Sequence, residues 1–127
     1  MAKKVLVVDD DPQNRRMLER LLLKLGHTPL ACGSCQEALD AFYDNTNSDI
    51  DLVLSDIQLL KHGPDGNILH ARIAEDLKRR QVEFVAMTGA TPEDARTYFA
   101  RHGVQVLEKP FGVECLEGIL AELQKTR

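Results

Sequence analysis

Five short apolar runs, each followed by a stretch with helical spacing, constrain this fold more than any other feature. The runs are KVLVVD (4–9), TPLAC (28–32), DLVLSD (51–56), VEFVAM (82–87) and VQVLEK (104–109). Runs of this length between helical patterns indicate buried strands joined by helical crossovers. Right-handed crossovers that cover both faces of a sheet predict an α/β fold with a parallel five-stranded sheet.

Start and stop signals place the helices between these strands. Pro12 and Gly26 bound the first helix. Its predicted buried side chains are Met17, Leu18, Leu21, Leu22 and Leu25. Ser34 and Glu37 have the spacing of a capping box, which predicts the start of the second helix. The other three helices are predicted over 64–80, from a cap at Thr91 to Gly103, and over 112–125. We therefore expect a flavodoxin-like (βα)5 three-layer sandwich with strand order 2-1-3-4-5.

The composition is that of one ordinary globular domain. The chain has 127 residues, of which 43% are hydrophobic and 28% charged, and its net charge is −4. The only basic cluster is residues 78–80, so nucleic acid is not an expected partner. The opening Met-Ala-Lys-Lys leads into an apolar run too short for a signal peptide or a membrane span. We expect a cytoplasmic protein without a membrane partner, comprising a single domain over 1–127 and no output domain.

Polar residues stand at the ends of four predicted strands. These are Asp9, Asp10 and Asp11 after the first strand, Asp56 at the end of the third, Thr88 at the end of the fourth and Lys109 at the end of the fifth. In the order 2-1-3-4-5, the first, third and fourth strands are neighbours. Ligands of such sheets bind beyond the carboxyl ends of the strands, so these side chains are expected to converge.

Converging carboxylates need a cation. Two carboxylates about 4 Å apart repel by roughly 4 kcal/mol at an effective dielectric constant near 20, and Lys109 alone cannot balance three acids. Mg²⁺ accepts carboxylate and carbonyl oxygens with waters, and it commonly completes its shell with phosphate oxygens. The pattern therefore predicts phosphoryl transfer, with Asp56 as the nucleophile and Lys109 and Thr88 near the phosphoryl oxygens.

Four motifs at the strand ends, VLVVDDDP, DLVLSD, FVAMTGA and EKPF, resemble the receiver domain of two-component response regulators. The resemblance spans the whole chain and implies a role for each matching residue. Asp56 matches the phosphoacceptor; Asp10, Asp56 and the carbonyl of Gln58 match the Mg²⁺ ligands, with Asp9 acting largely through water; Thr88 and Lys109 match the pair that contacts the phosphoryl group. Asp11 lies outside this set.

The chain departs from the family pattern in two places. Leu60 stands where the family usually has proline, and Asp65-Gly66 falls two residues later than usual, so the loop after Asp56 is longer. Val106 stands at the switch position, three residues before the lysine, where the family commonly has Tyr or Phe. We therefore hypothesise that the signal leaves through the 88–91 segment and the fourth helix, with Tyr98 and Phe99 taking part.

The resemblance implies a phosphoacceptor domain rather than an enzyme with turnover, apart from Mg²⁺-dependent self-phosphorylation and slow self-dephosphorylation. Its implied partners are a histidine kinase or histidine phosphotransfer protein and a downstream protein target. The domain is expected to be a monomer or a weak phosphorylation-dependent dimer. Two alternatives remain: a haloacid-dehalogenase-type phosphatase, for which Asp9 and Asp11 supply the Asp-x-Asp motif, and a docking module that needs no phosphorylation.

Three other features are assigned no function. Cys32 and Cys35 have the spacing of a redox pair, but they are more simply explained as core residues of a strand-to-helix junction. Arg15 and Arg16 lie on the polar side of the first helix and are expected to be solvated, although the resemblance also allows them to dock the kinase. The four histidines show no metal-binding spacing.

Overall fold

The structure, a computed structural model, describes residues 2–57, 66–89, 93–109 and 111–125. Its strands are β1 (Lys4–Val8), β2 (Thr28–Cys32), β3 (Ile50–Asp56), β4 (Glu83–Thr88) and β5 (Gln105–Glu108). Its helices are α1 (Pro12–Lys24), α2 (Cys35–Tyr43), α3 (Gly66–Arg80), α4 (Glu93–Arg101) and α5 (Val113–Lys125), with a 3₁₀ turn at Asn45–Asn47. All neighbouring strands are parallel, in the order β2-β1-β3-β4-β5. The predicted fold class and strand order are confirmed.

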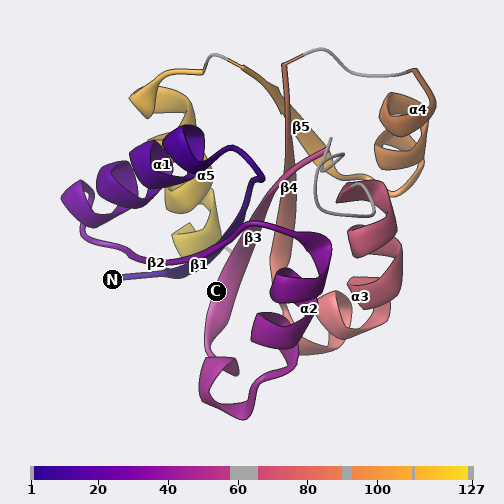
Figure 1. Ribbon diagram of the computed structural model, residues 1–127, viewed down its shortest axis with the longest axis horizontal. Helices are drawn as coiled ribbons and strands as arrows, with labels where there is room; N and C mark the ends of the chain where they lie inside the picture. The colour runs from indigo at the N-terminus through magenta and orange to yellow at the C-terminus, as the bar shows by residue number, and fades with distance from the viewer. Residues whose placement is uncertain (1, 58–65, 90–92, 110, 126–127) are drawn as a thin grey trace.

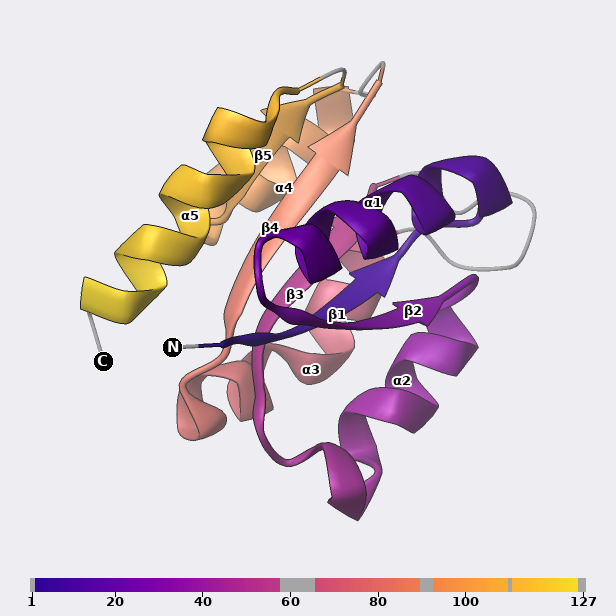
Figure 2. The same cartoon turned by 90° about the vertical axis from the view of Figure 1, so that its left-hand side faces the viewer.

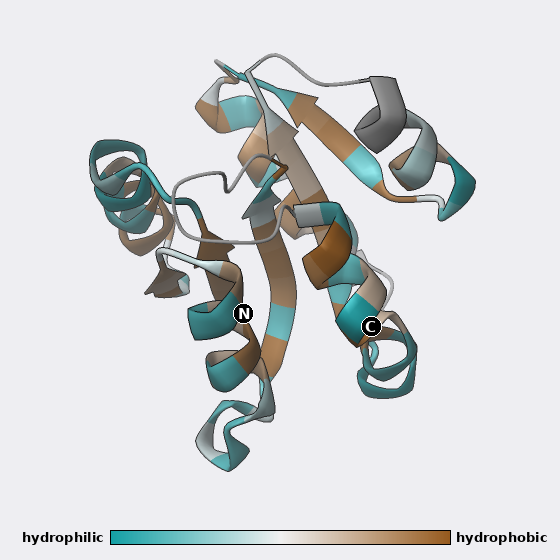
Figure 3. Ribbon diagram, turned by 45° about the vertical axis from the view of Figure 1, so that its right-hand side comes forward, coloured by the Kyte–Doolittle hydropathy of each residue, from teal (hydrophilic) through white to brown (hydrophobic). Residues whose placement is uncertain are grey.

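The sheet lies between two layers of helices. Helices α1 and α5 cover one face, and α2, α3 and α4 cover the other, as Figures 1 and 2 show from two directions. The strands are mostly apolar, whereas the outer faces of the helices are mostly hydrophilic (Figure 3). Because successive strand residues point to opposite faces, β1 contributes to two cores: Leu6 and Val8 pack beneath α2 and α3, and Val5 and Val7 pack beneath α1 and α5.

The helix caps agree with the sequence prediction in most details. Asp11 caps α1 by accepting a hydrogen bond from the Gln13 N–H at 3.0 Å. The Ser34 hydroxyl accepts from the Glu37 N–H at 3.1 Å. The other half of the predicted capping box is different, because the Glu37 carboxylate accepts from the Gly33 N–H and not from that of Ser34. The predicted cap at Thr91 lies outside the described residues.

One side chain predicted to be buried is exposed. Met17 on α1 is 53% exposed, and the apolar Ile68 on α3 is also 42% exposed. Each helix rests on the flat sheet along a narrow stripe, so positions beside that stripe stay in solvent even when they carry apolar residues. Leu18 and Leu22 form the buried stripe of α1.

Candidate functional site

The carboxyl ends of β1 and β3 bring three acids together. Val8 pairs with Ser55, so the next residues on these two strands, Asp9 and Asp56, lie side by side. One carboxylate oxygen from each of Asp9, Asp10 and Asp56 can be chosen such that all three lie within 4.8 Å of one another. Asp9 is fully buried and Asp56 is 8% exposed. The predicted convergence of the acids is present in the fold.

Lys109 reaches this acidic cluster from β5. Its Nζ lies 2.8 Å from Asp56 Oδ2 and 3.3 Å from Asp9 Oδ2. Burial alone would lower the pKa of Lys109, but its hydrogen bond to Asp56 and the negative charges of Asp56 and Asp9 hold that pKa above its ordinary value. Lys109 therefore stays protonated at neutral pH and balances part of the negative charge.

The other predicted site residues are placed as follows. Thr88 ends β4 and is 2% exposed, and its carbonyl accepts a hydrogen bond from the Lys109 N–H at 2.6 Å. The backbone thus joins the two residues that the resemblance assigns to the phosphoryl group. Val106, at the switch position on β5, is half-buried and packs against the core beneath α2, α3 and α4. Gln58 and Leu60 lie outside the described residues.

Sequence reasoning missed how the first turn of α1 holds Asp9. The Asn14 side-chain amide donates to Asp9 Oδ2, and the Arg15 guanidinium donates to the Asp9 carbonyl at 2.8 Å. The Asp11 N–H donates to Asp9 Oδ1 at 2.9 Å. Arg15 was expected to be solvated, and it is instead bound to the backbone of the site. No pattern marks these contacts, because they depend on the angle at which α1 leaves β1.

Gly66, the first residue of α3, makes a close backbone contact that its place in the family pattern did not predict. A Cβ built on Gly66 would lie 2.4 Å from the carbonyl oxygen of Asp56 and 3.1 Å from the Cα of Ile57. The Gly66 N–H donates to the Ile57 carbonyl at 2.8 Å. The start of α3 therefore touches the backbone that carries Asp56, at a distance that a side chain would prevent.

The donor set suits a hard divalent cation. Asp9, Asp10 and Asp56 present only carboxylate oxygens, and no histidine or thiol joins the cluster among the described residues. Carboxylates that occupy part of an octahedron, with waters or phosphate oxygens at the other positions, are what Mg²⁺ prefers. Softer ions such as zinc favour nitrogen and sulfur ligands. The residues present thus fit the predicted ion by their chemistry.

The sequence profile of the response regulator receiver domain matches residues 5–121, which is nearly the whole chain. The chain belongs to this family. The match agrees with the resemblance of the strand-end motifs, and it favours a receiver domain over the phosphatase alternative. In this receiver domain the three acids and Lys109 lie together at the carboxyl edge of the sheet.

Two curated relatives align with most of this receiver domain. The two-component response regulator ARR2 of Arabidopsis thaliana is 32% identical over 124 residues, which cover 91% of this chain and 17% of ARR2. The sensory/regulatory protein RpfC of Xanthomonas campestris pv. campestris (strain 8004) is 29% identical over 123 residues, which cover 96% of this chain and 16% of RpfC. The chain therefore spans less than a fifth of the length of these relatives.

Solved structures share the fold. A response regulator receiver domain protein from Clostridium thermocellum has a TM-score of 0.83 at 24% identity, covering 95% of this chain and 93% of that one. NtrX from Brucella abortus, solved in complex with ATP, has a TM-score of 0.83 at 27% identity, covering 99% of this chain and 28% of NtrX.

Each helix that the structure describes is too short or too polar to cross a membrane.

The CxxC pair shows no sign of redox activation. Cys32 and Cys35 are buried free thiols. Burial raises the pKa of Cys32 to about 11 and raises the pKa of Cys35 as well. Reactive cysteines need a lowered pKa and access to solvent, so these two thiols are core residues, as expected.

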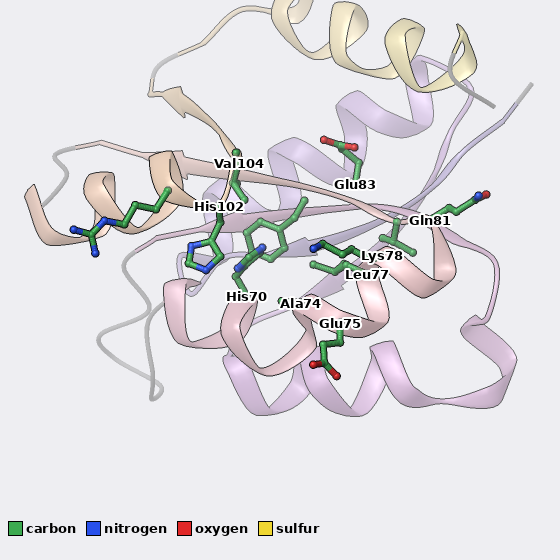
Figure 4. A pocket seen from close by; sticks show the side chains of 13 residues that line it. His70, Ala74, Glu75, Leu77, Lys78, Gln81, Glu83, His102 and Val104 are labelled. Carbon is green, nitrogen blue, oxygen red and sulfur yellow. The ribbon is translucent and has the colours of Figure 1, made fainter.

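A cavity of about 660 Å³ lies at the opposite end of the sheet from the acids, between α3, the start of β4 and the α4–β5 junction (Figure 4). His70 and His102 both line it. His70 is 6% exposed, and its Nδ1 lies 2.7 Å from the Tyr98 hydroxyl. Burial, together with the nearby His102, lowers the pKa of His70 to about 4. Sequence reasoning assigned no role to this histidine, which links α3 to α4.

This buried histidine predicts a pH-dependent stability. The folded state holds His70 neutral, whereas the unfolded chain takes up a proton near pH 6.5. The stabilisation is therefore complete above pH 6.5 and is lost as pH falls toward 4, by about 2 kcal/mol at pH 5. Urea unfolding at pH 7 and pH 5 measures the difference in the free energy of unfolding between these two conditions. We expect His70→Gln to reduce this difference strongly and His102→Gln to keep most of it, because burial is the larger cause of the lowered His70 pKa and His102 the smaller one. Equal differences in both variants would contradict the assignment.

Proposed function

We propose that this receiver domain accepts a phosphoryl group on Asp56, with Mg²⁺, from a histidine kinase or a histidine phosphotransfer protein. The phosphorylated domain then signals by binding a downstream protein. The observation that carries the proposal is the contact of Lys109 with Asp56 inside the cluster of Asp9, Asp10 and Asp56. Family membership and the names of the relatives as two-component regulators support the same assignment.

The chemistry is a phosphoryl transfer between a donor and one carboxylate. An oxygen of Asp56 attacks the phosphorus, and a P–O bond forms as the P–N bond of a phosphohistidine breaks. The electron pair of that bond stays on the departing nitrogen of the donor imidazole. The other ring nitrogen carries a proton taken from solvent, so the donor leaves as neutral histidine. Mg²⁺, when bound by Asp9, Asp10, Asp56 and the Gln58 carbonyl, would neutralise charge on the transferring group.

Lys109 and Thr88 bind and orient the transferring group. The Lys109 ammonium lies within hydrogen-bond distance of Asp56 Oδ2, so a short movement brings it to a phosphoryl oxygen attached there. Because the transition state of phosphoryl transfer is loose, a fixed positive charge at this place lowers the barrier mainly by positioning and charge stabilisation. Thr88, at the end of the neighbouring strand β4, supplies its hydroxyl as a second hydrogen-bond donor.

We also propose where the domain acts and in what oligomeric state. It acts in the cytoplasm, without nucleic acid or membrane as a direct partner, and it is a monomer or a weak phosphorylation-dependent dimer. Its own catalysis is limited to Mg²⁺-dependent self-phosphorylation and slow self-dephosphorylation. The signal leaves through the 88–91 segment and α4. The family's aromatic switch is replaced by Val106, and Tyr98 on α4 is hydrogen-bonded to His70 on α3.

A mass measurement tests the proposal directly. Incubation of the chain with Mg²⁺ and acetyl phosphate is expected to add one phosphoryl group, because Asp56 and Lys109 act on the phosphoryl group itself, whichever donor carries it. Intact mass spectrometry at a series of times measures the adduct and its decay. The same incubation with EDTA in place of Mg²⁺ is the control and should give no adduct. An unmodified chain at saturating donor and Mg²⁺ would favour the docking-module alternative.

A further inference from the structure

Asp9 is the most enclosed acid of the cluster. Its side chain is fully buried beneath its neighbours, so its oxygens rely on protein donors rather than on bulk water. Its Oδ1 accepts from the Asp11 N–H, and its Oδ2 accepts from the Asn14 amide and from Lys109. Each oxygen of this buried carboxylate therefore depends on specific protein donors.

Lys109, one of these donors, also contacts Asp56. Lys109 is bound to Asp9 at 3.3 Å and to Asp56 at 2.8 Å, and the proposed function requires it to follow the phosphoryl group on Asp56. As Lys109 moves, Asp9 Oδ2 loses its weaker and longer contact. A buried carboxylate that loses a donor rotates toward another partner unless a second donor remains.

We propose that Asn14 is a positioning residue for this site: its amide holds the Asp9 carboxylate in place while Lys109 moves between Asp9 and the phosphoryl group. The inference rests on the proposed function and adds a residue to it. An amide suits the task because it donates without adding charge, whereas a second cation beside Asp9 would compete with Mg²⁺. The amide must present its NH₂ group, since its oxygen would repel the carboxylate.

The local backbone holds Asn14 in this orientation. Asp11 caps α1 and Pro12 begins it, so the first turn of α1 is rigid and places Asn14 over Asp9. Arg15, the next residue, donates to the Asp9 carbonyl at 2.8 Å. Side chain and backbone of Asp9 are thus held by two consecutive residues of one helical turn. Arg15 fixes the backbone, and Asn14 fixes the direction of the carboxylate.

Asn14→Leu keeps the side-chain volume and removes the donor. We expect it to weaken Mg²⁺ binding about tenfold, as replacing a residue that orients a metal ligand commonly does. Isothermal titration calorimetry with Mg²⁺ alone, without a phosphodonor, measures the affinity. Gln13→Leu, at the exposed neighbouring position on α1, is the matched control and should bind Mg²⁺ like the wild type. Asn14→Ala, which adds no bulk, is the second variant if the leucine variant does not fold.

A double-mutant cycle separates positioning from a general loss of stability. In an Asp9→Asn background the Asn14 amide no longer faces a carboxylate, so Asn14→Leu should then change Mg²⁺ affinity less than twofold. An equal loss in both backgrounds, or wild-type affinity in both Asn14 variants, overturns the inference. If the wild type binds Mg²⁺ but takes no phosphoryl group, the proposed function fails on its own. A wild-type chain that binds no Mg²⁺ overturns both.

Discussion

Replacing Asp56 with asparagine is expected to abolish the phosphoryl adduct formed with Mg²⁺ and acetyl phosphate. An amide oxygen carries no negative charge and is a poor nucleophile toward phosphorus. Asp9 cannot take over, because it is fully buried and both of its oxygens accept hydrogen bonds from the protein. The fold should persist, since asparagine keeps an oxygen that can accept from Lys109. Intact mass and circular dichroism of the purified variant measure the two expectations.

The neighbouring acid Asp11 provides the matched control. Asp11→Asn also removes one negative charge near the site, but its side chain caps α1 and does not belong to the acidic cluster. Asparagine caps helices as well as aspartate does, so α1 should begin unchanged. We expect Asp11→Asn to be labelled to the same extent as the wild type. Labelling that survives in Asp56→Asn would show that Asp56 is not the phosphoacceptor. Labelling that disappears equally in both variants would attribute the loss to the removal of a nearby negative charge and not to Asp56 itself.

The sequence was sufficient for those parts of the site that follow from topology. Parallel strands place their carboxyl ends at one edge, so Asp9, Asp10 and Asp56 could be brought together from the strand order alone. The same rule placed Thr88 and Lys109 beside them. The fold class followed from the alternation of apolar runs and helical patterns, which is set by local sequence and by the handedness of crossovers.

The remaining features depend on distances that no periodicity encodes. Asn14 faces Asp9 only because α1 leaves β1 at a particular angle, and in the sequence it is one polar residue among several. His70 is buried because α4 packs its Tyr98 and Phe99 against α3, a tertiary contact between segments 28 residues apart in the case of Tyr98. Met17 was predicted to be buried and is exposed, because a helical pattern shows which face is apolar but not how wide the contact is.

Gly66→Ala is expected to destabilise the fold by about 2–3 kcal/mol, an effect at the upper end for one added methyl group. The new Cβ would meet the Asp56 carbonyl at 2.4 Å and the Ser55 hydroxyl at 3.2 Å, and the nearer atom is backbone that cannot rotate away. Either α3 or the end of β3 must shift, and the latter movement displaces Asp56 from Lys109. Urea unfolding measures the free energy, and the rate of labelling by acetyl phosphate should fall as well.

Gly118→Ala is the matched control, because it adds the same methyl group where there is room. Gly118 is exposed within α5, and a Cβ built there would have no heavy atom within 4 Å. Alanine is the better helix former by about 1 kcal/mol, so this variant should be more stable than the wild type. Opposite signs in the two variants would attribute the loss at Gly66 to the close approach of α3 to β3. A Gly66→Ala protein as stable as the wild type would mean that α3 does not pack closely against the Asp56 backbone. It would contradict the inference that this contact supports Asp56.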